Sequence, residues 1–215
     1  MRKLFFAFVA LLAVGCTEAY QQGVPAEWRA DLDAAIASSE RGEELKAALE
    51  TMDKSQRKDM AYLIINMPDF DRNGIDLELL KENVEYANIA REQFAWAQQL
   101  PEEVYLCDVL PYAVVDEVRD SWRKELYGIF APEVEGCTTM YDAVCAVNAN
   151  IPRLTGVDYN TLREKTNQSP SESMRQGMAS CTGLSILLVD AYRSVGIPAR
   201  FVGTASWHDN RGNHS

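Results

Sequence analysis

Apolar residues recur every three or four positions through most of this chain, a spacing that predicts amphipathic helices. The expected inward positions, helix by helix, are Trp28, Leu32 and Ile36; Leu45, Leu49 and Met52; Met60, Leu63, Ile64 and Met67; Leu80, Val84, Ala87 and Phe94; and Val118, Trp122 and Leu126. No fixed repeat length emerges, so residues 25–135 are predicted to form an irregular helical region rather than a solenoid.

Residues that typically start or end helices lie between these apolar segments. Pro25 is suited to begin the first helix, Pro68 to end the third, and Asp76 to cap the fourth. Gly128 is expected to stop the helix that contains Trp122. Residues 69–75 match the first half of a calcium-binding EF-hand loop, but position twelve is Leu80 instead of glutamate, so a polar turn is predicted there.

The pattern changes after Gly136. A helical stripe of Met140, Val144, Val147 and Ile151 is expected to end at Pro152. Residues 169–172 predict a loop entering a short helical turn before Gly177. A longer helix then runs from Cys181 to Gly196, residues 199–205 predict a strand, and residues 209–213 a turn, so that His214 opens an antiparallel strand. The fold class predicted is α+β.

Cys181 is the residue that points most directly to chemistry. It stands at the start of a helix whose buried stripe is Leu184, Leu187, Leu188, Ala191 and Val195. Free N–H groups and the positive end of the dipole at a helix N-terminus stabilise a thiolate, which is the nucleophilic form of cysteine. Cys181 is therefore a candidate nucleophile, and His214 a candidate base.

The run ASCTGLS at residues 179–185, the helix, GIPAR at 196–200 and the hairpin ending at His214 resemble the core of the transglutaminase-like superfamily, papain-fold enzymes with a Cys-His-Asp triad. The resemblance begins near Thr139 and implies that Cys181 is the nucleophile and His214 the base. It also implies acyl transfer without a cofactor, most simply hydrolysis of peptide or amide bonds. Protein transamidation and deglycosylation of glycopeptides are alternatives, and so is a non-enzymatic binding module.

The sequence departs from that family in two places. Gly177 lies four residues before the nucleophile, where the family's glycine usually lies two before it. The family's aspartate lies on the strand after the histidine, and no residue here can be assigned to it, so we expect the 215 residues to be a truncated product. His208 is an alternative base, although within the hairpin its side chain would be aimed less rigidly.

The first residues read as a bacterial lipoprotein signal. Arg2 and Lys3 precede an apolar stretch from Leu4 to Val14 that is too short to span a bilayer, and AVGC at residues 13–16 resembles a lipobox. Cleavage would leave Cys16 as the lipidated N-terminus, anchored to a membrane in the cell envelope. The alternatives are an ordinary secretory signal and a buried N-terminal helix.

These observations divide the chain into a signal peptide (1–15), a tether (16–24), a helical region (25–135) and a partial transglutaminase-like core (136–215). Residues 16–150 carry 12 basic and 27 acidic side chains, a net charge of −15, which disfavours nucleic acid as a partner. The partner that the resemblance implies is a peptide or protein substrate. The spacing of histidines and cysteines predicts no metal site. Cys107, Cys137 and Cys145 are expected in the core.

Overall fold

The chain is mostly helical in the computed structural model, which describes residues 17–204, 206, 212, 214 and 215. The helices before residue 110 are, in order, the 3-10 turns η1 (Ala19–Gln21) and η2 (Ala26–Trp28), α1 (Arg29–Ala37), α2 (Gly42–Thr51), α3 (Arg57–Asn66), α4 (Asp69–Gly74), α5 (Leu77–Gln93), α6 (Ala95–Gln98) and α7 (Glu102–Asp108). They are followed by α8 (Trp122–Val134), α9 (Met140–Thr155), α10 (Pro170–Gln176) and α11 (Cys181–Ser194). Strands β1 (Asp158–Tyr159) and β2 (Met178–Ala179) pair in parallel, which confirms the α+β class.

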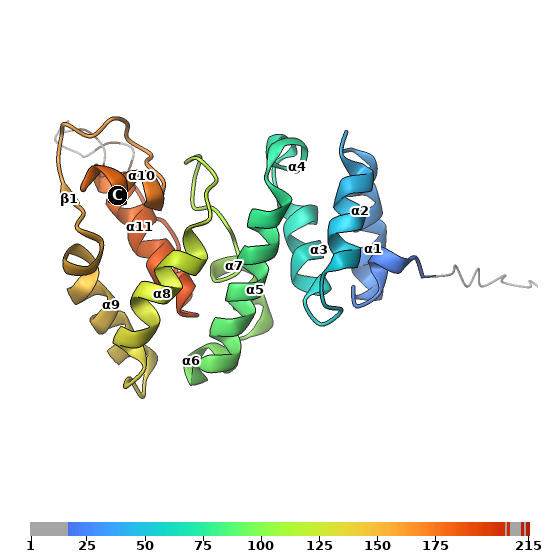
Figure 1. The fold of residues 1–215 in the computed structure, drawn as a ribbon, viewed down its shortest axis with the longest axis horizontal. Helices are drawn as coiled ribbons and strands as arrows, with labels where there is room; N and C mark the ends of the chain where they lie inside the picture. The colour runs from blue at the N-terminus through green and yellow to red at the C-terminus, as the bar shows by residue number, and fades with distance from the viewer. Residues whose placement is uncertain (1–16, 205, 207–211, 213) are drawn as a thin grey trace, which may run out of the picture.

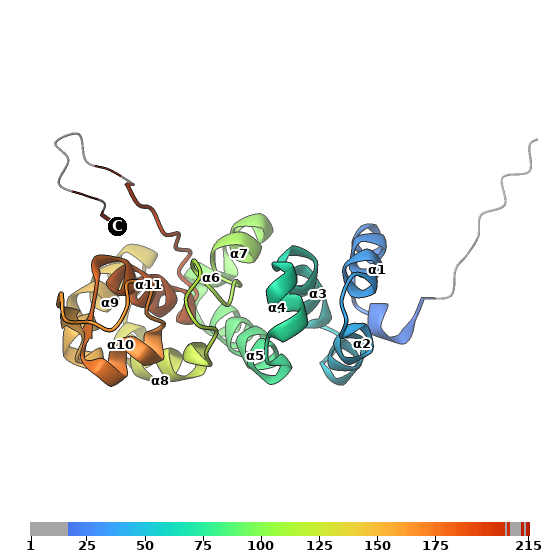
Figure 2. The same cartoon turned by 90° about the horizontal axis from the view of Figure 1, so that it is seen from above.

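The helices follow one another along the long axis of the molecule in nearly the order of the sequence (Figures 1 and 2). Helices α1 to α3 lie at one end, α5 crosses the middle, and α8 to α11 form the other end. Helix α5 contacts both α3 and α8, and α8 in turn packs against α9 and α11. Most helices therefore bury their apolar stripes against neighbours in the sequence, whereas α11 packs mainly against α8, beyond α9 and α10.

Two clusters of buried apolar side chains fill this arrangement. The first extends from Tyr20 to Tyr112 and contains the predicted inward positions of the first three helices except Trp28, which is half-buried and packs against it. It also contains Leu80, Val84 and Ala87 of α5. The second joins the end of α5, α6, α8 and α9 to α11, with Leu126, Phe130 and Leu187 at most 1 % exposed. Helix α5 contributes to both clusters, so it connects the two ends of the molecule.

Several predicted helix ends are confirmed by their hydrogen bonds. The carboxylate of Asp76 accepts from the N–H of Glu78 at 2.9 Å and caps α5. Ser169 and Glu172 form a reciprocal capping box at the start of α10, which ends at Gly177 with φ +65°. Gly196 follows α11 with φ +73°, a conformation that favours glycine.

Three helix boundaries differ from the predictions. Helix α8 continues through Gly128 to Val134, because Phe130 and Val134 extend its buried face and outweigh the weak helix propensity of glycine. Val118 lies before this helix and is 53 % exposed. Helix α9 likewise continues through Pro152 to Thr155 and ends at Gly156.

Residues 69–75 and 199–204 also differ from their predictions, while residue 205 of the predicted strand lies outside the described residues. The former contain the short helix α4 instead of a turn, because Arg72 donates to the carbonyls of Ile64 and Met67 and holds this segment against α3. In the latter, an isolated antiparallel bridge joins Thr204 to His214. Ala199 does not begin a strand, since its N–H donates to the carbonyl of Asp108.

The prediction that the three remaining cysteines are core residues is wrong for Cys145, which is exposed. It lies between the two buried positions of α9, Ala143 and Val147, and so faces away from the side that they share. Cys107 and Cys137 are half-buried. All three, together with Cys181, are free thiols.

Candidate active site

Cys181 is the first residue of α11, as predicted, and the preceding serine fixes the start of that helix. The hydroxyl of Ser180 accepts from the N–H of Gly183 at 3.0 Å and donates to the carbonyl of Thr166 at 2.6 Å. One side chain therefore caps the helix and ties it to the loop before α10. The thiol of Cys181 is held at the positive end of the helix dipole.

The small parallel sheet of β1 and β2 positions the residues that immediately precede Cys181. Tyr159 of β1 pairs with Ala179 of β2, two residues before Cys181, and the side-chain amide of Gln168 donates to the carbonyl of Met178 at 3.0 Å. The rest of α11 is anchored by its apolar stripe, in which Leu187, Ala191 and Val195 are buried, while Leu184 and Leu188 are half-buried. The end of the helix that carries the thiol is thus fixed from two sides.

Gly183 is a site-forming residue that the sequence pattern did not single out. A Cβ atom at this position would lie 3.0 Å from the Cβ of Ala179, so β2 can approach the first turn of α11 this closely because residue 183 has no side chain. A glycine two residues after a candidate nucleophile is the signal that could have indicated this contact.

The structure brings His214 to Cys181. Residues 204 and 214 exchange two backbone hydrogen bonds, of 2.8 and 3.1 Å, so the chain turns back toward the start of α11. The side chain of His214 hydrogen-bonds to the thiol of Cys181. The imidazole is solvent-exposed, whereas the thiol is half-buried. The two predicted site residues therefore come from segments 33 positions apart and meet at the end of one helix.

Residue 215 completes the surroundings of the thiol. The hydroxyl of Ser215 lies 4.0 Å from Sγ of Cys181, and 2.9 Å from the hydroxyl of Thr182. Burial would raise the pKa of the Cys181 thiol, but hydrogen bonds from His214, Ser215 and the N–H of Thr182 outweigh that effect and lower the pKa to about 7. A large fraction of the thiol is therefore ionised near neutral pH.

The other predicted site residues are not in this cluster. His208, the alternative base, and Cys16, the predicted lipidation site, lie outside the described residues. Within the part of the chain that the structure describes, no group of three or more histidine, cysteine or acidic side chains is arranged to hold a metal ion. None of the helices described from residue 17 onward is both long and apolar enough to cross a membrane.

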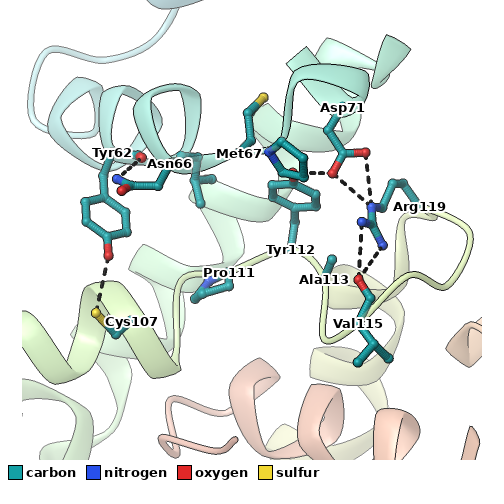
Figure 3. A pocket seen from close by; sticks show the side chains of 12 residues that line it. Tyr62, Asn66, Met67, Asp71, Cys107, Pro111, Tyr112, Ala113, Val115 and Arg119 are labelled. Carbon is teal, nitrogen blue, oxygen red and sulfur yellow. Dashed lines mark hydrogen bonds and ion pairs between the residues drawn. The ribbon is translucent and has the colours of Figure 1, made fainter. Parts of the chain in front are cut away.

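Two of the cavities outside the immediate surroundings of the thiol lie beside helices that bear on the site or on the first core cluster. One of about 320 Å³ lies between α3, α4 and the segment from Cys107 to Arg119 (Figure 3). Its polar groups bond one another, since Tyr112 donates to Asp71 at 2.7 Å and Tyr62 contacts the Cys107 thiol at 3.3 Å. The other, of about 430 Å³, runs along α11 from Ser185, one helical turn after Cys181.

Comparison with known proteins finds a family whose sequence model matches the C-terminal part of the chain. Residues 129–215 match the sequence model of the transglutaminase-like superfamily. The match begins within α8, about ten residues before Thr139, and covers α9, α10, α11 and the bridge to His214. Searches of curated proteins and of solved structures found no significant match to the chain.

Proposed function

From the transglutaminase-like superfamily domain at residues 129–215, we propose that this protein is a cysteine-dependent acyl-transfer enzyme, with Cys181 as its nucleophile and His214 as its base. The observation that carries the proposal is the hydrogen bond of His214 to a thiol whose pKa is lowered to about 7 at the start of α11. A nucleophile within hydrogen-bonding reach of a base is the arrangement that covalent acyl transfer requires.

The geometry supports the following sequence of steps. The Cys181 thiolate attacks the carbonyl carbon of an amide, and the C=O bond opens to an oxyanion. The N–H of Cys181 lies in the first turn of α11, where no helical carbonyl accepts from it, and so it is available to stabilise that oxyanion. Protonated His214 gives its proton to the departing amine as the C–N bond breaks, which leaves a thioester on Cys181.

The second half of the reaction sets the reaction class. His214 removes a proton from the incoming nucleophile, which attacks the thioester and releases the Cys181 thiolate. Water gives a carboxylic acid and completes hydrolysis, whereas a primary amine gives a new amide and completes transamidation. We propose hydrolysis of peptide or amide bonds, because water needs no binding site of its own. Cleavage of the amide that links a sugar to asparagine follows the same steps.

The thiol chemistry is tested by labelling with iodoacetamide at pH 7, followed by mass spectrometry of all cysteine peptides. We expect Cys181 to react fastest, and His214→Ala to slow its labelling and abolish turnover of amide substrates. Cys107, Cys137 and Cys145 serve as internal controls, since none of them is the first residue of a helix. Equal labelling rates for the four thiols would contradict the proposal.

A non-enzymatic binding module is the second candidate, because a superfamily domain can keep its shape without its chemistry. The two candidates differ in what happens to a bound peptide. In an enzyme, rapid acid quenching should trap the thioester on Cys181, because thioesters survive in acid, and Cys181→Ala should bind the same peptide without forming the adduct. A binding module would form no adduct in either protein.

We also propose that the chain is anchored in the cell envelope by acylation of Cys16. The support is the basic start, the apolar stretch and the small residues immediately before Cys16. Palmitate fed to expressing cells should label the wild-type protein and move it to the membrane fraction, whereas Cys16→Ser should remain unlabelled. Cys145→Ser is the matched control and should be labelled as the wild type is. Unlabelled wild-type protein would contradict the anchoring.

A further inference from the structure

A pair of hydroxyl groups connects residues 214 and 215, called here the return segment, to helix α11, which carries Cys181. Oγ1 of Thr182 and Oγ of Ser215 are 2.9 Å apart, within the range of a good hydrogen bond. Thr182 immediately follows the nucleophile, and Ser215 immediately follows His214. The hydrogen bond therefore links the two neighbours of the proposed catalytic pair.

This hydrogen bond reaches α11, whereas the backbone bridge between residues 204 and 214 does not. The two hydrogen bonds between residues 204 and 214 join these two residues to each other, and neither of them reaches α11. The Thr182–Ser215 contact joins residue 215 to α11 and spans 33 positions of the sequence. It fixes residue 215 relative to the helix, and so it limits where the adjacent imidazole can lie.

The same contact also fixes the position of the Ser215 hydroxyl relative to the sulfur of Cys181. The Ser215 hydroxyl is also 4.0 Å from Sγ of Cys181, so one oxygen lies between the Thr182 hydroxyl and the thiol. If Thr182 donates to Ser215, the Ser215 proton is directed toward the sulfur. Both hydroxyls belong to half-buried residues, where competition from water is reduced but not removed.

We infer that Thr182 and Ser215 are positioning residues, whose mutual hydrogen bond holds His214 beside the Cys181 thiol. The inference rests on the proposed function, because it assigns these two residues a role in the same site. Neither hydroxyl takes part in bond making or breaking. Loss of either should leave the catalytic pair present but less often in contact, and the thiolate less stabilised.

The test compares variants of Thr182 in the full chain. Thr182→Val keeps the shape of the side chain and removes its hydroxyl, and Thr182→Ser retains the hydroxyl. The rate of Cys181 alkylation by iodoacetamide is measured from pH 5 to pH 10. We expect Thr182→Val to slow labelling at pH 7 by about threefold, the scale of one neutral hydrogen bond, and to move the midpoint to higher pH. Thr182→Ser should match the wild type. Thr161→Val, an exposed threonine in the loop before α10, is the control and should change nothing.

Ser215→Ala gives an independent measurement if the Thr182 variant folds poorly. It should slow labelling at least as much as Thr182→Val, because it also removes the Ser215 hydroxyl from beside the sulfur. The double variant should be no slower than Ser215→Ala alone, because both substitutions remove the Thr182–Ser215 hydrogen bond. Wild-type rates and midpoints in both single variants would overturn the inference, and so would effects that multiply in the double variant.

The alkylation profile of His214→Ala shows whether a failure lies in this inference or in the proposed function. If His214→Ala leaves the alkylation profile of Cys181 unchanged, the proposed catalytic pair is wrong. If His214→Ala slows labelling while Thr182→Val and Ser215→Ala do not, the pair stands and the positioning role of the two hydroxyls is wrong.

Discussion

The thiol of Cys181 is made acidic by groups from two separate segments of the chain. The start of α11 contributes the N–H of Thr182, and the return segment contributes His214 and Ser215. Burial acts against them, because a charged sulfur is less well solvated inside the protein. The net lowering of the pKa to about 7 is therefore a property of the assembled site, and a cysteine at the same helix end without the return segment would be less acidic.

This balance predicts how the reactivity of Cys181 depends on pH. Alkylation should increase with pH and level off above a midpoint near pH 7, because the thiolate is the reactive form. In His214→Ala the midpoint should move toward the pKa of a free cysteine, about 8.5 or above. At pH 7 the smaller thiolate fraction is partly offset by the greater nucleophilicity of a more basic thiolate, so the rate should fall by up to about tenfold.

The pH profile is read from the initial alkylation rate of the Cys181 peptide. Cys145, which is exposed, provides the reference profile in the same sample. A Cys181 midpoint that coincides with that of Cys145 would show that the return segment does not act on the thiol.

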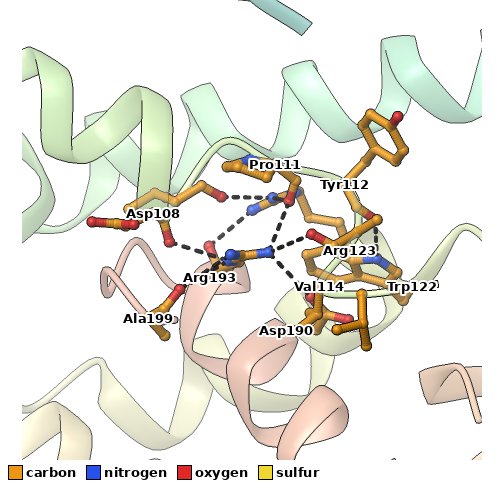
Figure 4. Close-up of polar contacts among 12 residues, drawn as sticks. Asp108, Pro111, Tyr112, Val114, Trp122, Arg123, Asp190, Arg193 and Ala199 are labelled. Atoms are coloured by element: carbon orange, nitrogen blue, oxygen red, sulfur yellow. Dashed lines mark hydrogen bonds and ion pairs between the residues drawn. The ribbon is translucent and has the colours of Figure 1, made fainter. Parts of the chain in front are cut away.

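At the scale of elements, two buried arginines join α11 to the rest of the molecule (Figure 4). Arg123 of α8 donates to the side chain of Asn83 at 2.7 Å, to the carbonyl of Arg193 at 2.9 Å and to that of Val109 at 2.7 Å. Arg193 of α11 donates to the carbonyls of Asp108, Ala113 and Ala199. The segment between α7 and α8 forms no helix, so these guanidinium groups satisfy carbonyls that would otherwise be buried without a partner.

Arg123→Met should therefore be strongly destabilising. The substitution keeps the side-chain volume approximately but leaves several buried carbonyls unpaired, and we expect a loss of about 3–5 kcal/mol in the free energy of unfolding. Chemical denaturation of purified protein measures it. Arg175→Ala is the matched control, because the Arg175 side chain is 62 % exposed, and it should change stability by less than about 0.5 kcal/mol. Equal stability of the two variants would contradict this role of Arg123.

Asp190 of α11 lies beside these arginines, and its environment is unfavourable to charge. It is fully buried, both carboxylate oxygens lack a hydrogen-bond partner among the described residues, and the nearest guanidinium nitrogen, on Arg193, is 3.9 Å away. Burial raises the pKa of Asp190 well above its usual range; Arg193 and Arg123 oppose the rise, and Glu117 and Asp120 reinforce it.

A raised pKa in the folded state has a defined effect on stability. Folded Asp190 retains its proton at pH values where the unfolded chain has lost it, so its contribution to stability is complete below the unfolded pKa of about 4 and decreases as the pH rises toward the folded pKa. Relative to the wild type, Asp190→Asn should therefore gain stability as the pH is raised from 4 to 8. Denaturation at each pH measures the difference, and a constant difference would show that Asp190 does not titrate abnormally.

At the scale of the whole molecule, α5 links two hydrophobic clusters that would otherwise belong to separate ends. Leu80, Val84 and Ala87 lie in the first cluster, while Ala90 and Phe94 lie in the second. The arginine contacts between α8 and α11 extend this connection to the helix that carries Cys181. We expect the two ends of the described structure to unfold together, because neither cluster is complete without α5.

Leu80→Ala tests this coupling. Leu80 is fully buried in the first cluster, so the substitution should cost about 2–5 kcal/mol. Hydrogen exchange followed by mass spectrometry should show a loss of protection in α2 and in α11 alike. Leu162→Ala is the control, since Leu162 is 82 % exposed, and it should leave both helices protected. Unchanged protection of α11 in Leu80→Ala would show that the two ends unfold independently.

The sequence by itself determined the longer helices, though not the short helices α4, α6 and α7, and the two residues of the proposed catalytic pair. Periodic apolar positions, together with Asp76, Ser169, Gly177 and Gly196 at helix ends, are local signals that act within one or two turns. Cys181 could be placed at a helix start for the same reason. Gly128 and Pro152 misled the prediction, because packing of a continuous buried face outweighs the helix propensity of a single residue.

Tertiary structure alone decided how these elements meet. The hydrogen bond of His214 to Cys181, the contact of Thr182 with Ser215, and the carbonyls that surround Arg123 all connect residues that are far apart in the sequence or lie in segments without regular structure. No periodicity encodes such contacts, since they depend on the path of the loops and on which buried polar groups lack a partner. The acidity of the Cys181 thiol therefore results from the fold, although its position at a helix start can be read from the sequence.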